Sequence, residues 1–496
     1  MSEAKKIEKT SPLYWVHVVI GLLLMIGFPQ LGPFEPITEV GMWIAGIFLG
    51  MVYLWSALDS IWPSILGLLL IALYSGYTGP EVTGYAAVKQ VFGAAVGSDT
   101  VICILFGMVL FGAIQQFGCT KYLARFFLTR KCFMGRPYVF LFVVFAASFF
   151  ISGFTMPIAS LLILWSLMIE TLKEFGYKKD DKIIWVSVFG IYLASTLGQP
   201  LFPFRGAALG ITGAFTAITG ETVNYSSYII YNLIISAIIL LIFLAFIKFI
   251  VRPDVTKMKA ITPEYFKKNT LPPMNIQQKA ILITCFVFIF LLLIPNFLPA
   301  DWAIKQILES YNSIGIFSIC LIVLMIIPIK GKSLFAFKEI AKNGVSWDIF
   351  FMVAAAMYIC NAVSDDVTGI KQFLVQILQP LLGNKPDLIF VMILIAFIII
   401  TTNFANNAGM AIIIMPIVVA FSGQYPDVPT TALCMTITMA AFVALLTPAA
   451  SPFCAMMHAN KEYISFKQII MLGLPVCVMA LIIYTVIGFP IAKFLF

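Results

Sequence analysis

A group of uncharged amides interrupts a long apolar stretch toward the carboxyl end of the chain. The residues from Thr401 read TTNFANNAGMAIIIMPIVVAF, and they include Asn403, Asn406 and Asn407. Amide side chains and the amino ends of half-helices can donate hydrogen bonds to a carboxylate without the cost of burying a cation. The pattern therefore predicts an anion-binding tip at Asn406 and Asn407. The alternative is that the amides, Asn403 above all, tie together the backbone of their own segment.

One basic residue lies in a similar apolar stretch in the first half of the chain. Arg205 follows Pro203 within STLGQPLFPFRGAALG. An arginine at membrane depth is costly unless it is paired or faces a cavity, and its planar fork suits a carboxylate. We therefore expect Arg205 to meet the charge of a substrate. The alternative is a shallow side chain that extends to the membrane interface.

The composition requires a membrane around these segments. The 496 residues are 61% hydrophobic and 11% charged, with a mean hydropathy of +1.01, which is more apolar surface than one soluble core can bury. Apolar runs of about 20 residues, the length of a membrane-spanning helix, recur along the chain. The sequence therefore predicts an all-α polytopic membrane protein whose solvent is the lipid bilayer.

The basic residues indicate how the chain is oriented. Lysines and arginines gather in clusters at residues 121–136, 173–182 and 248–279, whereas residues 28–40 and 422–430 contain none. Cytoplasmic loops collect such residues. We expect a multi-pass protein of the cell membrane with a cytoplasmic amino terminus. The net charge of +8 then reflects topology, and a nucleic-acid partner is not expected.

Two segments with a polar break in the middle have opposite orientations. Residues 137–172 begin and end at basic clusters, and residues 386–422 begin and end in weakly charged loops. Each is too long for one span and fits two half-crossings that meet at a tip. A segment broken at a Pro-Phe pair follows each of them, at residues 203–204 and 452–453. This predicts an inverted repeat with two re-entrant helical hairpins and two broken helices, as in secondary transporters that bind substrate near the bilayer midplane.

The same breaks suggest a division of the chain. Alignment of the two Pro-Phe pairs places Arg205 opposite Cys454. Residues 1–120 would form mostly scaffold helices, 121–250 the first repeat core, 251–279 a cytoplasmic linker and 280–496 the second half, with its broken helix at 430–460.

In order and spacing, these features resemble the divalent anion/sodium symporters, the dicarboxylate and citrate carriers, over nearly the whole chain. That family has a Ser-Asn-Thr triplet at each hairpin tip and a Thr-Pro break in each following helix. The resemblance implies about eleven transmembrane helices plus two hairpins. It also implies a homodimer and an elevator-like movement of a transport domain against a scaffold domain.

The resemblance also implies site residues. The triplets fall on Ser152, Gly153 and Phe154 and on Asn406, Asn407 and Ala408, of which Ser152 and Asn407 keep the family residue. The implied substrate site consists of Ser152, Gly153, Phe154, Thr155, Arg205, Asn406, Asn407, Ala408, Ser451 and Pro452. One implied sodium site consists of Ser148, Ser152, Gly153 and the Leu201 carbonyl, and the other of Thr402, Ala405, Asn407 and the Ala450 carbonyl. Gly153 removes an amide from the first, whereas the second keeps Thr402 and Asn407.

The expected function is secondary active transport of an organic anion of the di- or tricarboxylate type, coupled to sodium. A sodium-independent anion exchanger and a proton-coupled carrier of the same fold remain open. An intramembrane enzyme is the remote alternative, because the sequence contains no HExxH or GxGD motif. We interpret His458 as an interfacial residue rather than a proton relay, and Asp365 and Asp366 as part of a solvated outer loop.

Overall fold

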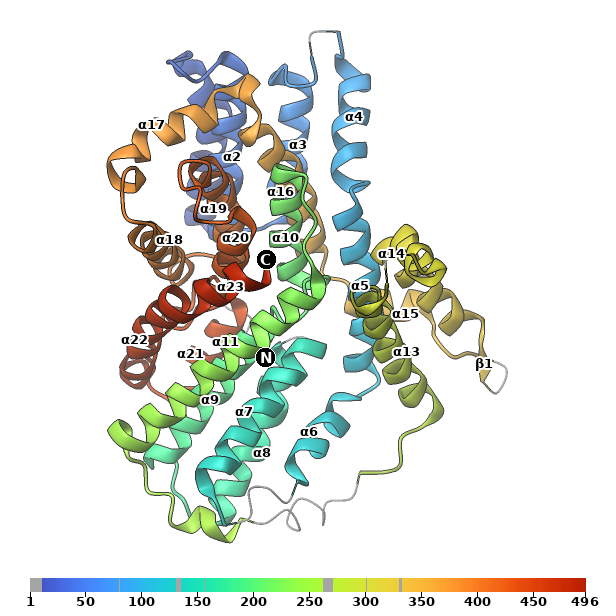
Figure 1. Ribbon diagram of the computed structural model, residues 1–496, viewed down its shortest axis with the longest axis vertical. Helices are drawn as coiled ribbons and strands as arrows, with labels where there is room; N and C mark the ends of the chain where they lie inside the picture. The colour runs from blue at the N-terminus through green and yellow to red at the C-terminus, as the bar shows by residue number, and fades with distance from the viewer. Residues whose placement is uncertain are drawn as a thin grey trace.

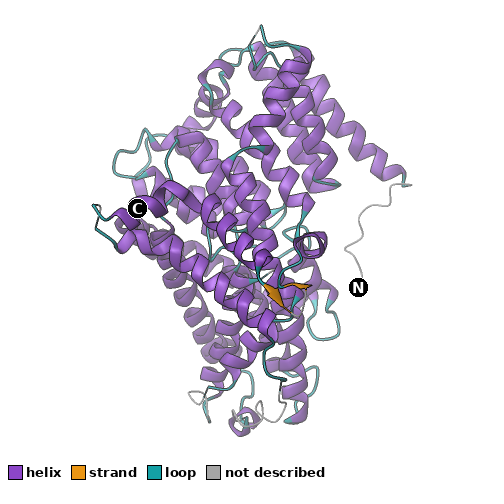
Figure 2. Ribbon diagram, turned by 90° about the vertical axis from the view of Figure 1, so that its right-hand side faces the viewer, coloured by secondary structure: helices purple, strands orange, loops and turns teal. Residues whose placement is uncertain are grey.

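The computed structural model describes residues 11–79, 81–130, 135–155, 157–261, 271–299, 301–329 and 332–496. Most of them are helical, and Figure 2 shows a bundle of helices with one small patch of strand. That patch is an antiparallel pair of two-residue strands, β1 (Pro328–Ile329) and β2 (Lys332–Ser333). The predicted all-α fold class is confirmed.

The outer surface of the bundle is suited to lipid. By length and composition, nine helical segments among the described residues can cross a membrane, or up to ten if the bent pair Ile370–Leu382 and Asp387–Thr402 counts as one span. Leu241, Ile283 and Val478 are each more than half exposed on such segments. This confirms a polytopic membrane protein. The family resemblance implied about eleven spans, and the structure divides both broken helices into shorter helices that are not counted among the nine.

Three groups of helices lie outside the two repeat cores. The amino-terminal helices are α1 (Pro12–Leu22), α2 (Glu39–Ala57), α3 (Ile61–Tyr74), α4 (Gly84–Val96), α5 (Asp99–Gln116) and α6 (Thr120–Leu128). The central ones are α13 (Ile276–Leu293), α14 (Ala303–Ile326), α15 (Phe337–Gly344), α16 (Trp347–Ser364) and α17 (Ile370–Leu382). The chain ends with α22 (Phe466–Ile483), a π-helical turn at Tyr484–Gly488, and α23 (Phe489–Leu495).

Polar side chains cap several helix starts. The Thr38 hydroxyl accepts a hydrogen bond from the Gly41 amide at the start of α2. Asn275 with Gln278 and Ser465 with Gln468 form capping boxes at α13 and α22, in which each side chain bonds the backbone of the other residue. Such caps satisfy amides that the first helical turn leaves unpaired.

The first predicted hairpin is present as α7 (Pro137–Phe154) and α8 (Pro157–Glu174), two arms that meet near Thr155. Helix α9 (Lys182–Gly198) packs along both arms, and Figure 1 shows the three helices side by side at the lower end of the molecule. The chain is not helical at residues 199–205 and then forms α10 (Gly206–Thr219). Helix α11 (Tyr225–Phe246) follows. The broken helix is therefore α9 with α10.

The second repeat core has the same order of elements. Helices α18 (Asp387–Thr402) and α19 (Asn407–Ser422) form the second hairpin, with its tip at residues 403–406. The broken helix consists of α20 (Thr430–Ala440) and α21 (Pro452–Ala459), separated by residues 441–451. Helix α10 lies near the centre of the molecule (Figure 1), in contact with α5, α16 and α19. The division into scaffold and transport domains stays a prediction.

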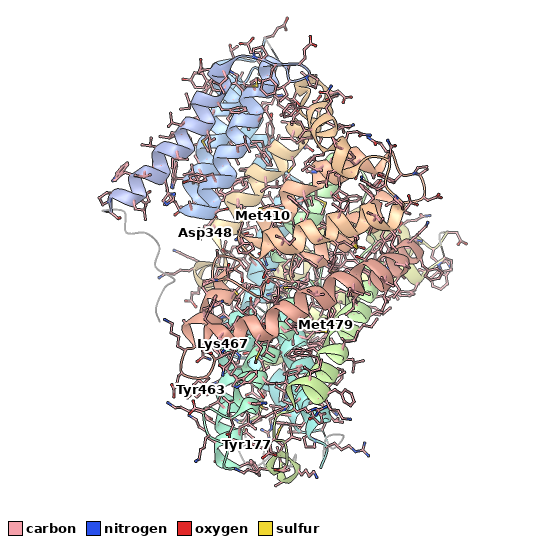
Figure 3. The ribbon with its side chains drawn as sticks, turned by 90° about the vertical axis from the view of Figure 1, so that its left-hand side faces the viewer. Tyr177, Asp348, Met410, Tyr463, Lys467 and Met479 are labelled. Carbon is pink, nitrogen blue, oxygen red and sulfur yellow. The ribbon has the colours of Figure 1, made fainter. Side chains whose placement is uncertain are left out.

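The basic end of the first hairpin is tied to the second repeat. The Lys173 ammonium of α8 donates a hydrogen bond of 2.9 Å to the hydroxyl of Tyr463, which follows α21. At the same end, the Tyr177 hydroxyl accepts from the amide of Met258. Figure 3 shows Tyr463 and Tyr177 toward one end of the molecule. The loops that carry the predicted cytoplasmic charge therefore lie close together.

Candidate substrate and ion site

The first hairpin is held against α9 by serine hydroxyls. Ser148 Oγ donates to the Ile191 carbonyl at 2.7 Å and Ser152 Oγ donates to the Ser195 carbonyl at 2.6 Å. Both serines are fully buried. The two serines are one helical turn apart on α7, and their acceptors are one turn apart on α9. Helices α7 and α9 therefore lie side by side over this stretch. Two residues of the first predicted sodium site thus lie against the broken helix.

Arg205 closes the contact between the hairpin tip and the break. Its Nη1 donates to the Ser152 carbonyl at 3.2 Å and also to the Gly153 carbonyl, and its guanidinium carbon lies 5.4 Å from the centre of the Phe111 ring. Gly153 leaves room for Leu201 of the break beside the tip, since a Cβ there would lie 2.6 Å from Leu201 Cδ2. The structure therefore places Arg205 at the hairpin tip, against the alternative of a side chain extended to the interface.

The second predicted ion site is assembled in a parallel way. Thr402 Oγ1 donates to the Ala441 carbonyl at 2.7 Å, and the backbone N–H of Asn407 donates to the Ala450 carbonyl at 3.2 Å. Thr402, Asn407 and Ala450 are buried, and Ala405 is half-buried beside them in the chain. Asn407 Oδ1 accepts from the Ala408 amide. The tip of the second hairpin thus lies against the break of the second broken helix.

All three tip asparagines use their side chains to bond the backbone, Asn407 through the Ala408 amide. Asn403 Nδ2 donates to the carbonyls of Ile399 and Val443, and its Oδ1 accepts from the amides of Leu445 and Leu446. These contacts correspond to the alternative interpretation, in which Asn403 ties the backbone together. Asn406 Oδ1 accepts from the Gly409 amide and caps α19.

A cavity of about 450 Å³ opens beside the first hairpin tip, at the contact with α5. Its polar lining comes from Thr155, Arg205 and Gln199 near the hairpin and from Gln115 and Gln116 on α5. Gln199 Oε1 is shielded from solvent and accepts no hydrogen bond from the described residues. The apolar lining residues are Met108, Phe111, Pro157, Ile158, Ala207, Ile349 and Phe453. The half-buried guanidinium of Arg205 therefore lies in the wall of a largely apolar cavity.

The cavity includes only part of the predicted substrate residues. Thr155 and Arg205 line it, whereas the described lining does not include Asn406, Asn407, Ala408, Ser451 or Pro452. Ser152, Gly153 and Phe154 lie just behind it at the tip. Sequence reasoning missed Gln115, Gln116 and Gln199, although glutamines within the apolar runs FGAIQQFG and TLGQPLF were a usable signal.

The helix starts correct the alignment of the two halves. Arg205 is the N-cap of α10 and Ser451 is the N-cap of α21, where its hydroxyl accepts from the Cys454 amide. Arg205 therefore corresponds to Ser451 rather than to Cys454. Alignment on the Pro-Phe pairs gave a different result because Pro203 lies three residues before the first residue of α10, whereas Pro452 is itself the first residue of α21. The first turn of α10 borders the cavity through Gly206 and Ala207.

Other titratable groups singled out in the sequence have local partners. His458 Nε2 lies 3.1 Å from the Leu446 carbonyl. The Asp365 carboxylate accepts from the Tyr77 hydroxyl at 3.0 Å, and burial together with this carboxylate raises the pKa of Tyr77. Asp366 is exposed, as expected for a solvated loop.

Paired hairpins, broken helices and a cavity with an arginine at a hairpin tip define a membrane transporter rather than an enzyme. The sequence pattern of the sodium:sulfate symporter transmembrane region matches residues 204–496, and the chain belongs to this family. The family resemblance seen in the sequence is thereby confirmed.

Relatives extend the similarity over nearly the full length. The sodium-dependent dicarboxylate transporter SdcS of Staphylococcus saprophyticus is 23% identical over 96% of this chain and 93% of its own length. An uncharacterized transporter of Haemophilus influenzae is 20% identical over 95% of each chain. Among solved structures, the YdaH transporter of Alcanivorax borkumensis matches with a TM-score of 0.55 and 14% identity, covering 93% of this chain and 98% of that one. This last likeness concerns the fold.

Proposed function

We propose that the protein carries di- or tricarboxylate anions across the cell membrane, and that the anion binds in the cavity at the first hairpin tip. The observation that carries the proposal is the guanidinium of Arg205 in the cavity wall. Both of its hydrogen bonds to described residues come from Nη1, which leaves Nε and Nη2 for a carboxylate. The Gln199 side-chain amide and the amino end of α10 can supply further donors.

An organic anion fits this cavity better than sulfate does. Phe111, Phe453, Ile158 and Ile349 line much of it, and its volume of about 450 Å³ far exceeds that of one tetrahedral ion. A carbon skeleton can contact the apolar walls while its carboxylates meet Arg205 and Gln199. The name of the Staphylococcus saprophyticus relative, a dicarboxylate transporter, supports the same substrate class.

We propose that sodium is co-transported through the second site. The oxygens of Thr402, Asn407 and Ala405 and the Ala450 carbonyl are hard ligands that suit sodium. At the first site, the carbonyls of Ser152 and Gly153 already accept from Arg205, so a fixed positive charge lies where the resemblance implied a first sodium ion.

The same fixed charge supports a second candidate, sodium-independent exchange of anions. In that mode the guanidinium supplies the positive charge and no sodium is needed. The inferred movement in both modes is elevator-like, in a homodimer with a cytoplasmic amino terminus. Each hairpin would move together with its own broken helix, because the contacts of Ser148, Ser152 and Thr402 join the two.

Uptake of labelled succinate by proteoliposomes tests the proposal. We expect uptake that excess succinate or citrate suppresses and equal sulfate does not, and that rises with external sodium. Suppression by sulfate alone would overturn the substrate class. Uptake that does not depend on sodium but requires dicarboxylate inside the proteoliposomes would support the anion exchanger instead.

A further inference from the structure

A second cavity, of about 640 Å³, lies between α5, α10, α13 and α14. It shares two helices with the first cavity. On α5, Asp99 and Cys103 line the second cavity and Phe111 and Gln115 line the first. On α10 the order is reversed, since Ala207 lines the first cavity and Thr212, Gly213 and Thr216 line the second. The two cavities therefore follow each other along the same pair of antiparallel helices.

Phenylalanine side chains fill the space between the cavities. The rings of Phe288 and Phe317 stack with their centres 3.8 Å apart, and Phe204 lies 5.3 Å from Phe288. Phe111 lies 6.2 Å from Phe204 and 6.4 Å from Phe317. We call Phe111, Phe204, Phe288 and Phe317 the phenylalanine cluster. Each ring is at most 1% exposed, so the cluster is a dry layer.

Helix α5 passes the cluster at a glycine. Cys103, Gly107 and Phe111 are one helical turn apart and so lie on one face of α5. A Cβ at Gly107 would lie 3.3 Å from the Phe317 ring and 3.4 Å from the Phe204 carbonyl. Along this face of α5, Cys103 lines the second cavity, Gly107 contacts the phenylalanine cluster and Phe111 lines the first cavity. The cluster separates the two cavities along this path.

Charge places the two cavities toward opposite sides of the membrane. Gln116, at the end of α5 that borders the first cavity, is followed by the basic segment 121–136, and the α15 helix beside it carries Lys338 and Lys342. At the second cavity the described lining contains the carboxylates of Asp99 and Glu309. By the tendency of basic loops to stay in the cytoplasm, the first cavity is cytoplasmic and the second external.

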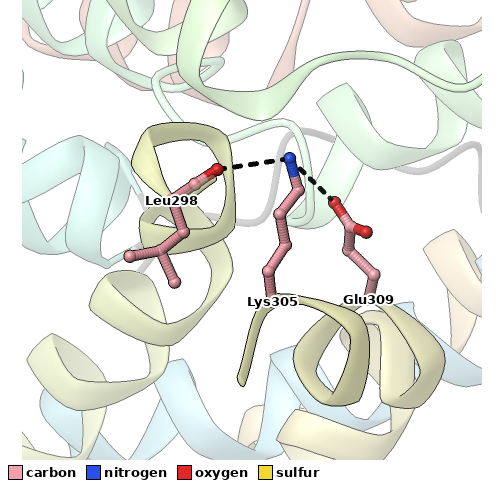
Figure 4. A network of polar contacts seen from close by, with 3 residues as sticks. All are labelled: Leu298, Lys305 and Glu309. Atoms are coloured by element: carbon pink, nitrogen blue, oxygen red, sulfur yellow. Dashed lines mark hydrogen bonds and ion pairs between the residues drawn. The ribbon is translucent and has the colours of Figure 1, made fainter. Parts of the chain in front are cut away.

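A basic residue near the second cavity is paired with an acidic one. Lys305 Nζ lies 3.8 Å from Glu309 Oε1 and 3.4 Å from the Leu298 carbonyl, to which it donates (Figure 4). One turn beyond Glu309, Asn312 adopts a φ of +51° inside α14 and its side chain accepts from Ser313. Such a conformation is costly for a residue other than glycine. It marks a bend in α14 between the second cavity and Phe317.

We infer that the second cavity is the external access vestibule of the carrier and that the phenylalanine cluster is the barrier that keeps it separate from the cytoplasmic cavity. The inference rests on the proposed function, since both cavities would belong to one transport route. The barrier joins parts that the proposed movement would separate, because Phe204 belongs to the first broken helix whereas Phe111, Phe288 and Phe317 come from α5, α13 and α14. Movement of the broken helix would shift Phe204 past the other three rings. The substrate site would then be accessible from the opposite side of the membrane.

Site-resolved labelling tests this assignment without any substrate. Ala207→Cys reports on the first cavity and Thr216→Cys on the second, and Cys103→Ala removes the native thiol that lines the second. A membrane-impermeant maleimide is added to right-side-out or to inside-out vesicles, and the modified residue is identified by peptide mass spectrometry. We expect Thr216→Cys to react from the external side and Ala207→Cys from the cytoplasmic side. Reaction of both from the same side would overturn the inference.

The barrier is tested in the same vesicles with Phe317→Ala. Removal of this ring should let Thr216→Cys react from both sides, and Phe317→Leu should do so to a smaller degree. Phe243→Ala is the control, because Phe243 is equally buried on α11 and lines neither cavity. If Phe317→Ala does not fold, Phe317→Leu decides, and unchanged sidedness in the folded variant refutes the barrier. A failed carboxylate uptake assay would instead refute the proposed function and leave the labelling result standing.

Discussion

The replacement of Arg205 gives the sharpest test of the substrate site. Arg205→Lys keeps a positive charge but has neither the planar fork nor the reach to serve two carbonyls and a ligand together. One charge-assisted hydrogen bond contributes roughly 1.5–3 kcal/mol. Its loss corresponds to a rise in the dissociation constant of about tenfold to a hundredfold. We expect Arg205→Lys to raise KM for succinate within that range.

Arg205→Ala has a larger effect than Arg205→Lys, because it removes both the charge and the hydrogen-bond donors of the side chain. It leaves the carbonyls of Ser152 and Gly153 without their donor beside a buried cavity, at a cost of roughly 1–3 kcal/mol for each unpaired group. We therefore expect near-complete loss of uptake together with a lower thermal unfolding temperature.

Succinate uptake by proteoliposomes gives KM, and a thermal shift with and without succinate gives binding independently of transport. Arg136→Ala is the matched control, because Arg136 is an exposed basic residue at the far end of the same α7 arm. It should leave both readings near those of the parent chain. If Arg205→Ala transports with unaltered KM, Arg205 only fastens the hairpin tip and the anion is held by helix ends and amides.

Three further outcomes are expected. Asn407→Ala should abolish sodium-dependent uptake while the protein stays folded by size-exclusion chromatography, and near-normal uptake would remove this tip from the mechanism. Sodium dependence of uptake should be shallow, with a Hill coefficient of about one since one site is left for a free cation, and a steep multi-ion dependence would contradict the role given to Arg205. Asn403→Leu should lower thermal stability because four backbone partners lose their hydrogen bonds, and an unchanged melting temperature would refute that role.

The arrangement of the hairpins could be predicted because its causes are local in the sequence. Basic clusters, polar breaks and apolar run lengths each act over a few residues, and they place the tips at Gly153 and Asn407. The structure has the turns beside these positions, near Thr155 and at residues 403–406. The partner of Arg205 could not be predicted in this way. Its contacts join residues 52 and 53 positions apart, and they depend on how α7 packs against the break.

The other polar side chains of the first cavity could not be predicted from local sequence either. Gln115 and Gln116 lie on α5, outside both repeats, and nothing in their local sequence indicates which helix they face. Conversely, Asn406 has a polar side chain of the expected type but uses it to cap α19. Residue type predicted what each group can do, and the packing of distant helices decided which of them meet a ligand.

The guanidinium at the hairpin tip also affects how the carrier responds to voltage. On the proposed movement Arg205 travels with the substrate site, so a dianion with one sodium ion and this fixed charge crosses with no net charge. The empty carrier, in contrast, must return with an uncompensated positive charge. Moving one elementary charge through the whole potential costs about 2.3 kcal/mol per 100 mV, in addition to the desolvation that the anion would otherwise offset. An inside-negative membrane would therefore hold the empty carrier facing the cytoplasm until another anion loads, and this favours exchange over net uptake in an energised cell.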